Sequence, residues 1–169
     1  VRADIAVVQV GGPIGKRDAP SEHGEAIARF VASELGLTVT PVWHTDRSGP
    51  VSFGHWLSLV SGSLGKIGQD IVLMSQQGID EVTLRGGGSS SAMPHKGNPV
   101  LAEAMVTLAR YVAGQQGVLL QAMIHEQERS GIAWPLEWMT LPVMAEATGA
   151  ALNHALAVFT QIERLGSSD

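Results

Sequence analysis

Residues 86–98 read Gly-Gly-Gly-Ser-Ser-Ser-Ala-Met-Pro-His-Lys-Gly-Asn, and no other stretch of this 169-residue chain restricts its fold as strongly. Four glycines and three serines in thirteen positions predict a backbone that holds neither a helix nor a strand. A passive linker would have little use for the methionine, histidine, lysine and asparagine among them. Asn98 and Pro99 then favour a helix start, with asparagine as N-cap and proline at the first helical position. Because a helix N-terminus favours an anion, this loop suits an active-site lid over a carboxylate.

Apolar side chains outside this stretch recur at helical spacing. Over residues 53–74 they step by three or four positions, as in the seam between packed helices. The pattern predicts four helices, over residues 21–35, 52–78, 99–129 and 140–165, separated by loops that include residues 37–51 and 130–142. Ser21 and Ser52 are the expected N-caps, and Gly36 is the expected stop of the first helix. Since about thirty helical residues span roughly 45 Å, the predicted fold class is an all-α, elongated long-helix bundle.

The composition excludes several classes of function. The formal net charge is −5 without any run of lysine or arginine, so nucleic acid is not an expected partner. The chain has no cysteine, which excludes disulfides and thiol catalysis and agrees with a cytoplasmic location. No apolar run approaches the ~18 residues of a membrane span, and no signal peptide is visible. Charged residues amount to 16%, which predicts helices packed on several sides within a bundle or an oligomer.

Other interpretations of the motifs are weaker. A disordered linker between helices is the plain alternative for residues 86–98. His95 precedes Lys96, so the stretch lacks the glycine of a Walker A loop. His125 and Glu126 begin like a zinc-binding helix, but Arg129 stands where the second histidine is needed, and no metal is expected. Histidines and serines are scattered, so no Ser-His-Asp order can be assigned.

Residues 89–98 resemble the Gly-Ser-Ser-x-Met-Pro-x-Lys-x-Asn motif of the fumarase/aspartase superfamily. The one departure is Ser89, where that motif usually has glycine. The resemblance extends over nearly the whole chain and implies the long-helix bundle of that superfamily. Residues 1–169 are then expected to be a single helical region, the C-terminal part of the central bundle domain. Because the sequence starts at Val1 without methionine, we expect an upstream domain outside it.

Within the superfamily the chain is most similar to 3-carboxy-cis,cis-muconate cycloisomerases. The similarity rests on residues 9–12 (Gln-Val-Gly-Gly), 43–47 (Trp-His-Thr-Asp-Arg), 126–129 (Glu-Gln-Glu-Arg) and 134–138 (Trp-Pro-Leu-Glu-Trp). Adenylosuccinate lyases generally place serine and arginine in this last stretch to hold a phosphate, whereas this chain has two tryptophans and a glutamate. The departures from the cycloisomerases are Pro13-Ile14, Lys16-Arg17 and Ser48, and they leave substrate specificity open.

The resemblance implies roles for particular residues. Ser90 would exchange a proton with carbon, and Lys96 would stabilise the charge of the carbanion intermediate. Ser91, Met93 and Asn98 would contact the substrate, a small di- or tricarboxylate, and no cofactor is required. Arg47, Thr45 and His44 are further candidates for binding a substrate carboxylate, with a hydrogen-bonded loop as the alternative. For Trp134 and Trp138 we expect packing at a helix turn or a subunit contact rather than contact with the substrate.

The expected function is a cycloisomerase of aromatic catabolism through protocatechuate, the β-ketoadipate pathway. The superfamily also implies a homotetramer whose active sites combine several subunits, so residues 1–169 alone are expected to be inactive. One alternative is a superfamily lyase, such as adenylosuccinate lyase, that releases fumarate. A second alternative is a helical scaffold without catalysis, although Ser90, Lys96 and Asn98 together argue against it.

Overall fold

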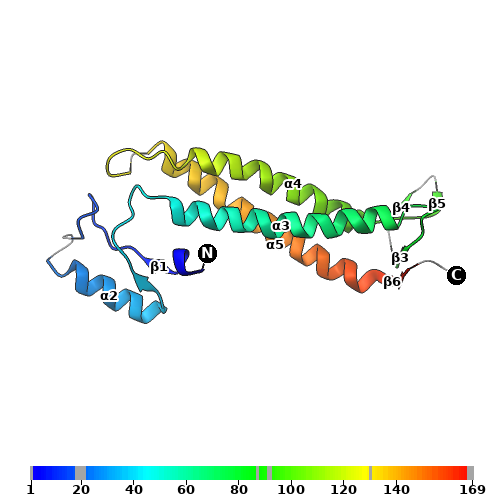
Figure 1. The fold of residues 1–169 in the computed structure, drawn as a ribbon, viewed down its shortest axis with the longest axis horizontal. Coiled ribbons are helices and arrows are strands. Elements are labelled where there is room, and N and C mark those ends of the chain that lie inside the picture. Colours follow the sequence, from blue (N-terminus) through cyan, green and yellow to red (C-terminus); the bar gives the residue numbers. More distant parts are fainter. Residues whose placement is uncertain (1, 18–21, 87, 91–92, 130, 167–169) are drawn as a thin grey trace. The chain divides into compact units, whose positions relative to one another are not determined.

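The computed structural model describes residues 2–17, 22–86, 88–90, 93–129 and 131–166, with only the backbone described over 88–90 and 93–97. In chain order its elements are α1 (Arg2–Ile5), β1 (Val7–Val8), α2 (Gly24–Leu35), β2 (Thr38–Val39), α3 (Ser48–Met74), β3 (Val82–Leu84), β4 (Gly88–Ser90), β5 (Met93–Asn98), α4 (Val100–Gln121), α5 (Ala133–Gln161) and β6 (Ile162–Leu165). Long helices dominate this order (Figure 1), which confirms the all-α, long-helix class. None of the described helices is both long and apolar enough to cross a membrane.

The chain divides into two compact units. Unit 1 contains residues 1–56 and 116–142, and unit 2 contains residues 57–115 and 143–169. The helices α3, α4 and α5 each contribute residues to both units. The site candidates therefore fall into two groups, with the 44–47 loop in unit 1 and the 86–98 stretch in unit 2.

In unit 1 a short crossover carries the chain from β1 through α2 to β2, and the two strands pair in parallel. Ala28 and Ala32 form the buried side of α2. Gly36 ends the helix in the left-handed conformation, with φ of 64°, and the backbone N–H of Leu37 donates to the carbonyl of Ala32 at 2.9 Å. The predicted stop at Gly36 is confirmed because it depends on local backbone conformation alone. The predicted cap Ser21 lies outside the described residues.

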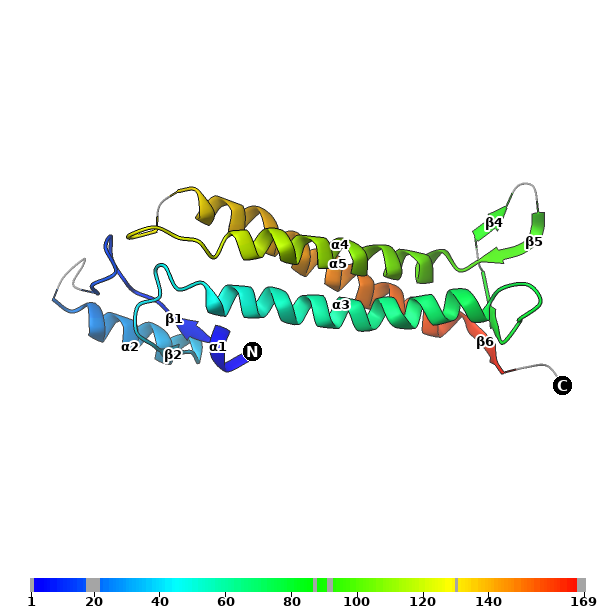
Figure 2. The same ribbon diagram turned by 45° about the horizontal axis from the view of Figure 1, so that its top comes forward.

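In unit 2 the three long helices pack around one apolar core (Figure 2). Its fully enclosed members come from all three helices and from β3, namely Ile71, Val82, Ala102, Met105, Ala155 and Val158. The helices α3 and α4 approach closely where α3 presents glycine. A Cβ atom on Gly68 would lie 2.6 Å from the Ala102 carbonyl oxygen, so the two backbones meet without a side chain between them.

The structure corrects the prediction that residues 86–98 hold neither a helix nor a strand. The strands β4 and β5 pair antiparallel, with Gly88 opposite Asn98 and Ser89 opposite Gly97. We call residues 88–98 the signature hairpin. Glycine lowers strand stability but does not forbid it, and the pairing gives the backbone N–H and C=O groups partners that an isolated segment would lack.

The helix bounds also differ from those predicted. The helix α3 begins at Ser48 instead of Ser52, and the Asp46 carboxylate accepts the backbone N–H of Ser48 at 3.0 Å. Pro50 fits the first turn, where its missing N–H would have no intrahelical acceptor. The helix α4 ends at Gln121 rather than 129, where the backbone N–H groups of Ala122 and Met123 donate to carbonyls three residues back. The chain turns further on, with positive φ at Gln127 and Arg129.

The predicted loop over residues 130–142 is wrong, since α5 already begins at Ala133. Pro135 lies in the first turn of that helix, where proline is tolerated. Pro142 lies inside the helix and removes one intrahelical hydrogen bond without ending it. At the other end the helix stops at Gln161 instead of 165, because residues 162–165 form β6 and pair with β3.

The close approach of α3 and α4 makes a testable prediction. Gly68→Ala should lower the free energy of unfolding by about 1–3 kcal/mol, because the new methyl group would overlap the Ala102 carbonyl. Gly62→Ala, in the same helix with nothing within 4 Å of the added Cβ, should instead raise it by about 0.5–1 kcal/mol. Urea unfolding of both variants measures the difference. Equal effects would contradict the close approach.

Candidate functional site

The strongest polar contact in unit 1 joins Arg47 and Glu137. Arg47 directly precedes α3, and Glu137 lies in the second turn of α5. The guanidinium donates from Nε to Oε2 at 2.8 Å and from Nη2 to Oε1 at 2.5 Å, a bidentate ion pair. Arg47 is 5% exposed and Glu137 6%, so water does not screen the pair. Each charge depends on the other, because neither could remain buried alone.

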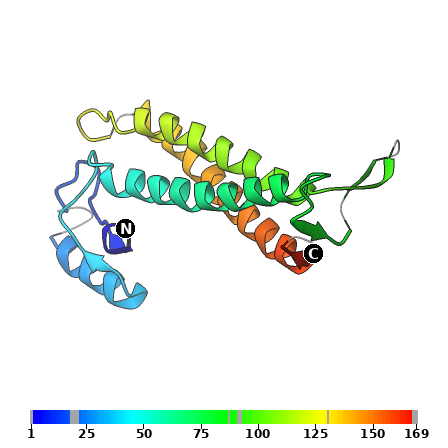
Figure 3. The same ribbon diagram turned by 45° about the vertical axis from the view of Figure 1, so that its right-hand side comes forward.

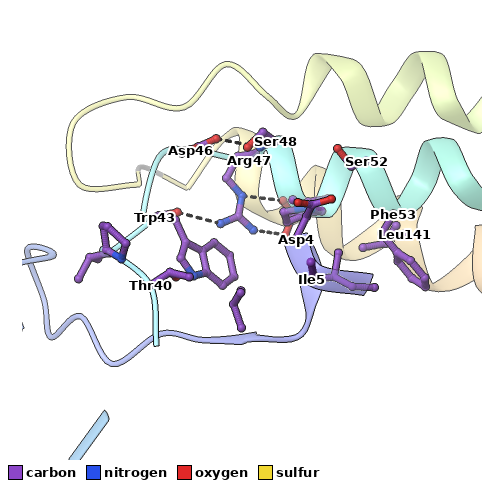
Figure 4. A pocket seen from close by; sticks show the side chains of 17 residues that line it. Asp4, Ile5, Thr40, Trp43, Asp46, Arg47, Ser48, Ser52, Phe53 and Leu141 are labelled. Atoms are coloured by element: carbon purple, nitrogen blue, oxygen red, sulfur yellow. Dashed lines mark hydrogen bonds and ion pairs between the residues drawn. The ribbon is translucent and has the colours of Figure 1, made fainter. Parts of the chain in front are cut away.

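Trp43 completes the surroundings of Arg47. The guanidinium carbon lies 5.1 Å from the centroid of the indole ring, within cation–π range. The backbone carbonyl of Trp43 accepts an N–H of Nη1 at 3.5 Å, a long hydrogen bond. Figure 4 shows Arg47 lying beside Trp43, with dashed lines to that carbonyl and to the carboxylate on α5. These contacts use three of the five N–H groups of the guanidinium.

A second aromatic group lies at the start of α5. The Arg129 guanidinium carbon is 3.5 Å from the centroid of Trp134, and the rings of Trp134 and Trp138 have centroids 4.4 Å apart. Trp138 is still 57% exposed. The arrangement agrees with the packing role expected for these tryptophans and ties the turn before α5 to the helix itself.

His125 is the titratable group that these charges influence. Both of its ring nitrogens are buried without a hydrogen bond of normal geometry to the described residues. Burial lowers the pKa of His125 below its usual range, and the nearby positive charge of Arg47 lowers it further. Glu137 and the backbone of Ala122 act on this pKa in the opposite direction but do not cancel the effect. The imidazole is therefore held in its neutral form.

A pocket of about 810 Å³ opens within unit 1 beside the ion pair. Arg47, Glu137 and Trp43 form its polar wall, and Ile5, Phe53 and Leu141 are among its apolar lining. Such a mixture suits a small molecule with a polar group and an apolar body. Glu137 already neutralises the charge of Arg47, so an incoming carboxylate would not meet a free cation. It could accept hydrogen bonds only from the two guanidinium N–H groups that the described contacts do not use.

The other two candidates on this loop lie elsewhere. Thr45 is exposed and is not part of the pocket lining. His44 is buried with 9% exposure, also outside the lining. Its ring packs so closely on the preceding glycine turn that a Cβ atom on Gly11 would lie 2.4 Å from the ring carbon Cε1. The structure thus brings together Arg47 and the pocket, but not Thr45 or His44.

The candidates on the signature hairpin lie in unit 2. The backbone of Ser90 ends β4, and Met93 and Lys96 lie in β5, whereas Ser91 is outside the described residues. Asn98 is the last residue of β5 and is partly buried. Its backbone pairs with Gly88, and Pro99 rather than the predicted Asn98 occupies the N-cap position of α4. The helix begins one residue later than expected, and the carbonyl of Pro99 accepts its first intrahelical N–H, from Glu103.

Sequence reasoning missed Glu137 as a site residue. It belonged to a stretch used only for the family resemblance and for its lack of a phosphate site, and its partner Arg47 is 90 positions away. The sequence did contain an indication of this role, because Glu137 stands between the apolar residues Leu136 and Trp138. A carboxylate on an apolar helix face indicates a buried partner of opposite charge. Among the described residues, no group of three or more histidine or acidic side chains gathers as a metal site would require.

Comparison with known proteins places these features in context. Residues 9–114 match the model of a family described as Lyase. The 3-carboxy-cis,cis-muconate cycloisomerase of Acinetobacter baylyi is 35% identical over 167 residues, 96% of this chain and 37% of the relative. Nitrosuccinate lyase of Streptomyces davaonensis is 34% identical over 90% of this chain and 35% of its own. The crystal structure of the 3-carboxy-cis,cis-muconate lactonizing enzyme of Pseudomonas putida aligns with a TM-score of 0.87 and 38% identity, over 96% of this chain and 37% of that one.

The buried ion pair predicts an unequal response to charge removal. Glu137→Gln keeps the shape of the side chain but leaves Arg47 buried without a counter-charge, which should lower the free energy of unfolding by about 3–5 kcal/mol. Asp70→Asn, which breaks the exposed pair with Lys66, should lower it by about 0.3–0.5 kcal/mol. Urea unfolding of both variants provides the test. Similar losses would mean that Arg47 does not depend on Glu137.

The lowered pKa of His125 predicts a pH dependence of stability. Below about pH 6.5 His125 takes up a proton more readily in the unfolded chain than in the folded chain. The free energy of unfolding therefore decreases as the pH is lowered through this range. His125→Gln should make this decrease of the free energy of unfolding less steep, by at most about 1.4 kcal/mol per pH unit. The comparison needs urea unfolding of both proteins between about pH 5 and 8. The two slopes should agree above about pH 7.5, and identical slopes below pH 6.5 would contradict the assignment.

Proposed function

The chain belongs to the Lyase family of the fumarase/aspartase superfamily, and from this premise we propose that it is the signature-bearing part of a 3-carboxy-cis,cis-muconate cycloisomerase. The observation that carries the proposal is the sequence of residues 89–98, which fits the superfamily motif at every position except Ser89. The 35% identity to the Acinetobacter cycloisomerase supports the same assignment. The chain spans about 37% of that relative's length, so the proposal concerns the activity of a larger protein.

In the proposed reaction a carboxylate oxygen of the substrate adds to a carbon–carbon double bond of the same molecule. A carbon–oxygen bond forms and closes a lactone, and the other carbon of the double bond gains a proton. The intermediate carbanion is delocalised into a neighbouring carboxylate, which then approaches two negative charges. Its stabilisation needs fixed donors and a cation directed at those oxygens.

We assign these roles to the signature hairpin. Ser90 exchanges the proton with carbon, and Lys96 supplies the positive charge. Asn98 offers amide N–H groups, and Ser91 and Met93 contact the substrate. The N-terminus of α4 follows directly and adds the positive end of its dipole. Because ring closure and proton transfer change no oxidation state overall, the proposed reaction needs no redox cofactor. With the charge stabilisation assigned to Lys96 and the N-terminus of α4, we propose that it requires no metal or nucleotide either.

Arg47, Thr45 and His44 form the second group of candidates in the proposal. The ion pair with Glu137 limits Arg47 to the N–H groups that the carboxylate and the Trp43 carbonyl do not use. Thr45 could approach a substrate from the exposed side of its loop. His44 would need to leave its packed position against Gly11. Arg47 is therefore the strongest of the three.

The proposal extends to assembly and location. The substrate is a small di- or tricarboxylate of the β-ketoadipate pathway, and the protein acts in the cytoplasm. We propose a homotetramer with each active site built from several subunits. Large apolar side chains on the helices of unit 2 stay exposed, among them Leu59 at 59%, Leu156 at 66% and Phe159 at 52%. Exposure of this extent supports burial against other subunits.

A lyase of the same superfamily is the second candidate. The similarity to nitrosuccinate lyase, 34% identity over 165 residues, favours it specifically. A lyase would eliminate a leaving group beside a carboxylate through the same carbanion, so the hairpin residues would keep their roles. Product analysis separates the two candidates, because a lyase releases an unsaturated acid whereas the cycloisomerase forms a lactone.

The test follows the loss of ultraviolet absorbance of 3-carboxy-cis,cis-muconate with the longest natural polypeptide that carries this sequence. Ser90→Ala should reduce turnover by about 10²–10⁴-fold, because it removes the proton-transfer group. The neighbouring variant Ser89→Ala is the matched control and should keep most of the rate. Residues 1–169 alone should show no turnover.

Three results would count against the proposal. Wild-type protein that leaves the absorbance unchanged but cleaves adenylosuccinate or nitrosuccinate would favour the lyase. Equal rates for wild type and Ser90→Ala would remove serine from the mechanism. Inactivity on every superfamily substrate, with correct assembly, would favour a scaffold.

A further inference from the structure

The base of the signature hairpin is held by the segment that follows α5. The strand β3 ends at Leu84, four residues before β4 begins, and it pairs antiparallel with β6. Two backbone hydrogen bonds extend this pairing, from Arg85 N–H to the Gln161 carbonyl at 2.7 Å and from Gly166 N–H to the Glu81 carbonyl at 2.8 Å. Figure 3 shows the dark-green arrow of β3 beside the red end of α5. All of these residues belong to unit 2.

Arg164 makes the most extensive side-chain contacts of this anchor. Its Nη2 donates to the backbone carbonyl of Asp80 at 2.6 Å and lies 3.4 Å from Oγ1 of Thr83. Its Nη1 donates to the carbonyl of Gly166. One partly buried guanidinium thus connects the turn before β3, β3 itself and the end of β6. Hydrogen bonds from a charged donor are stronger than neutral ones, and a planar fork fixes direction as well as distance.

The turn that Arg164 contacts is conformationally unusual. Asp80 has a φ of 49°, in the left-handed region that non-glycine residues seldom adopt. Its carboxylate accepts the backbone N–H of Gly78 at 3.0 Å, and its carbonyl accepts Arg164. The conformation of Asp80 is therefore held from both sides, and it sets the direction in which β3 leaves the turn.

A neighbouring ion pair offers a comparison within the same strands. Arg85, the residue after β3, and Glu163 of β6 contact each other at 2.9 Å, but their side chains are 79% and 42% exposed. Exposed pairs of this kind contribute little. Arg164 differs from Arg85 in its partners: it donates to backbone carbonyls at Asp80 and Gly166, whereas the side chain of Arg85 makes an ion pair with Glu163.

The other end of the hairpin is fixed independently. Its second strand β5 ends at Asn98, and Pro99 leads directly into α4. That helix is held by its close contact with Gly68 and by the unit 2 core. The pairing of β4 with β5 sets the positions of Ser90 and Lys96 within the hairpin. With β5 tied to α4, the orientation of the whole hairpin relative to the N-terminus of α4 depends on the position of β3, from which the chain runs to β4.

We propose that Arg164 is a positioning residue for the signature hairpin: by fixing β3 against β6 it sets the orientation of the paired strands β4 and β5, and with them Ser90, relative to the N-terminus of α4. The catalytic part of this inference rests on the proposed function, whereas the anchoring part does not. Since misplacement of a reacting group by about 1 Å can reduce a rate about 10²-fold, loss of the anchor has a kinetic consequence.

The experiment compares Arg164→Ala with the control Arg85→Ala in the longest natural polypeptide that carries this sequence. Hydrogen exchange, followed by mass spectrometry, reports on residues 82–98 and on the core of unit 2. Steady-state kinetics with 3-carboxy-cis,cis-muconate give kcat and KM. For Arg164→Ala we expect faster exchange over residues 82–98 with unchanged exchange in the core, and a kcat about 10–100-fold lower with a smaller change in KM. For Arg85→Ala we expect less than a twofold change in kcat.

Arg164→Lys adds a graded variant, because lysine keeps the charge but lacks the planar fork, and it replaces alanine if that variant unfolds. It should recover part of the lost kcat and of the protection from exchange. Unchanged exchange over residues 82–98 overturns the proposal whatever the kinetics. Wild-type kcat with faster exchange overturns the catalytic part, and exchange that rises equally throughout unit 2 shows a merely structural role. If the wild-type protein does not convert this substrate, the proposed function fails while the exchange measurement still decides the anchor.

Discussion

The buried ion pair between Arg47 and Glu137 is the interaction on which unit 1 depends. It joins the loop before α3 to α5, and in a region that excludes water each charge requires the other. Apolar contacts could be satisfied in several registers of a loop against a helix, but a bidentate carboxylate–guanidinium contact is satisfied in one. The guanidinium of this pair lies beside the Trp43 ring, and both partners line the pocket. Their charges also act on the pKa of His125.

Features that depend on neighbouring residues could be predicted from the sequence, and features that depend on distant residues could not. The stop at Gly36 is local, and the long apolar-periodic helices are nearly so. The start of α3 was missed because Asp46 and Pro50 act together as a helix start, although Pro50 alone indicates a break. Pro135 misled the prediction of α5 for the same reason. The ion pair with Glu137 joins positions 90 apart, and no local pattern contains that information.

The signature hairpin shows both sides of this distinction. Its proposed chemistry rests on a motif of fixed spacing, which the sequence alone displays. Its backbone was predicted wrongly because strand pairing depends on the partner strand. The pairing also explains why Ser89 can replace the usual glycine of the motif. Ser89 lies in β4 opposite Gly97, in extended backbone that any residue adopts. A glycine is therefore not required there for conformational reasons, and the departure leaves the fold of the hairpin intact.

The contacts of unit 1 also bear on the choice between the proposed cycloisomerase and a lyase that binds a nucleotide. A phosphate group needs cations that are not already neutralised. Glu137 takes the charge of Arg47 in a buried pair, and Arg129 lies over the face of Trp134. Trp134 and Trp138 lie in the segment where a phosphate-binding relative would present serine and arginine, and they pack against each other with tilted rings. The proposed substrate has no phosphate, and its carboxylates are assigned to Lys96 and the N-terminus of α4, so it places no such demand on this segment. The electrostatics of the described residues in unit 1 therefore support the proposed cycloisomerase over a lyase that binds a nucleotide.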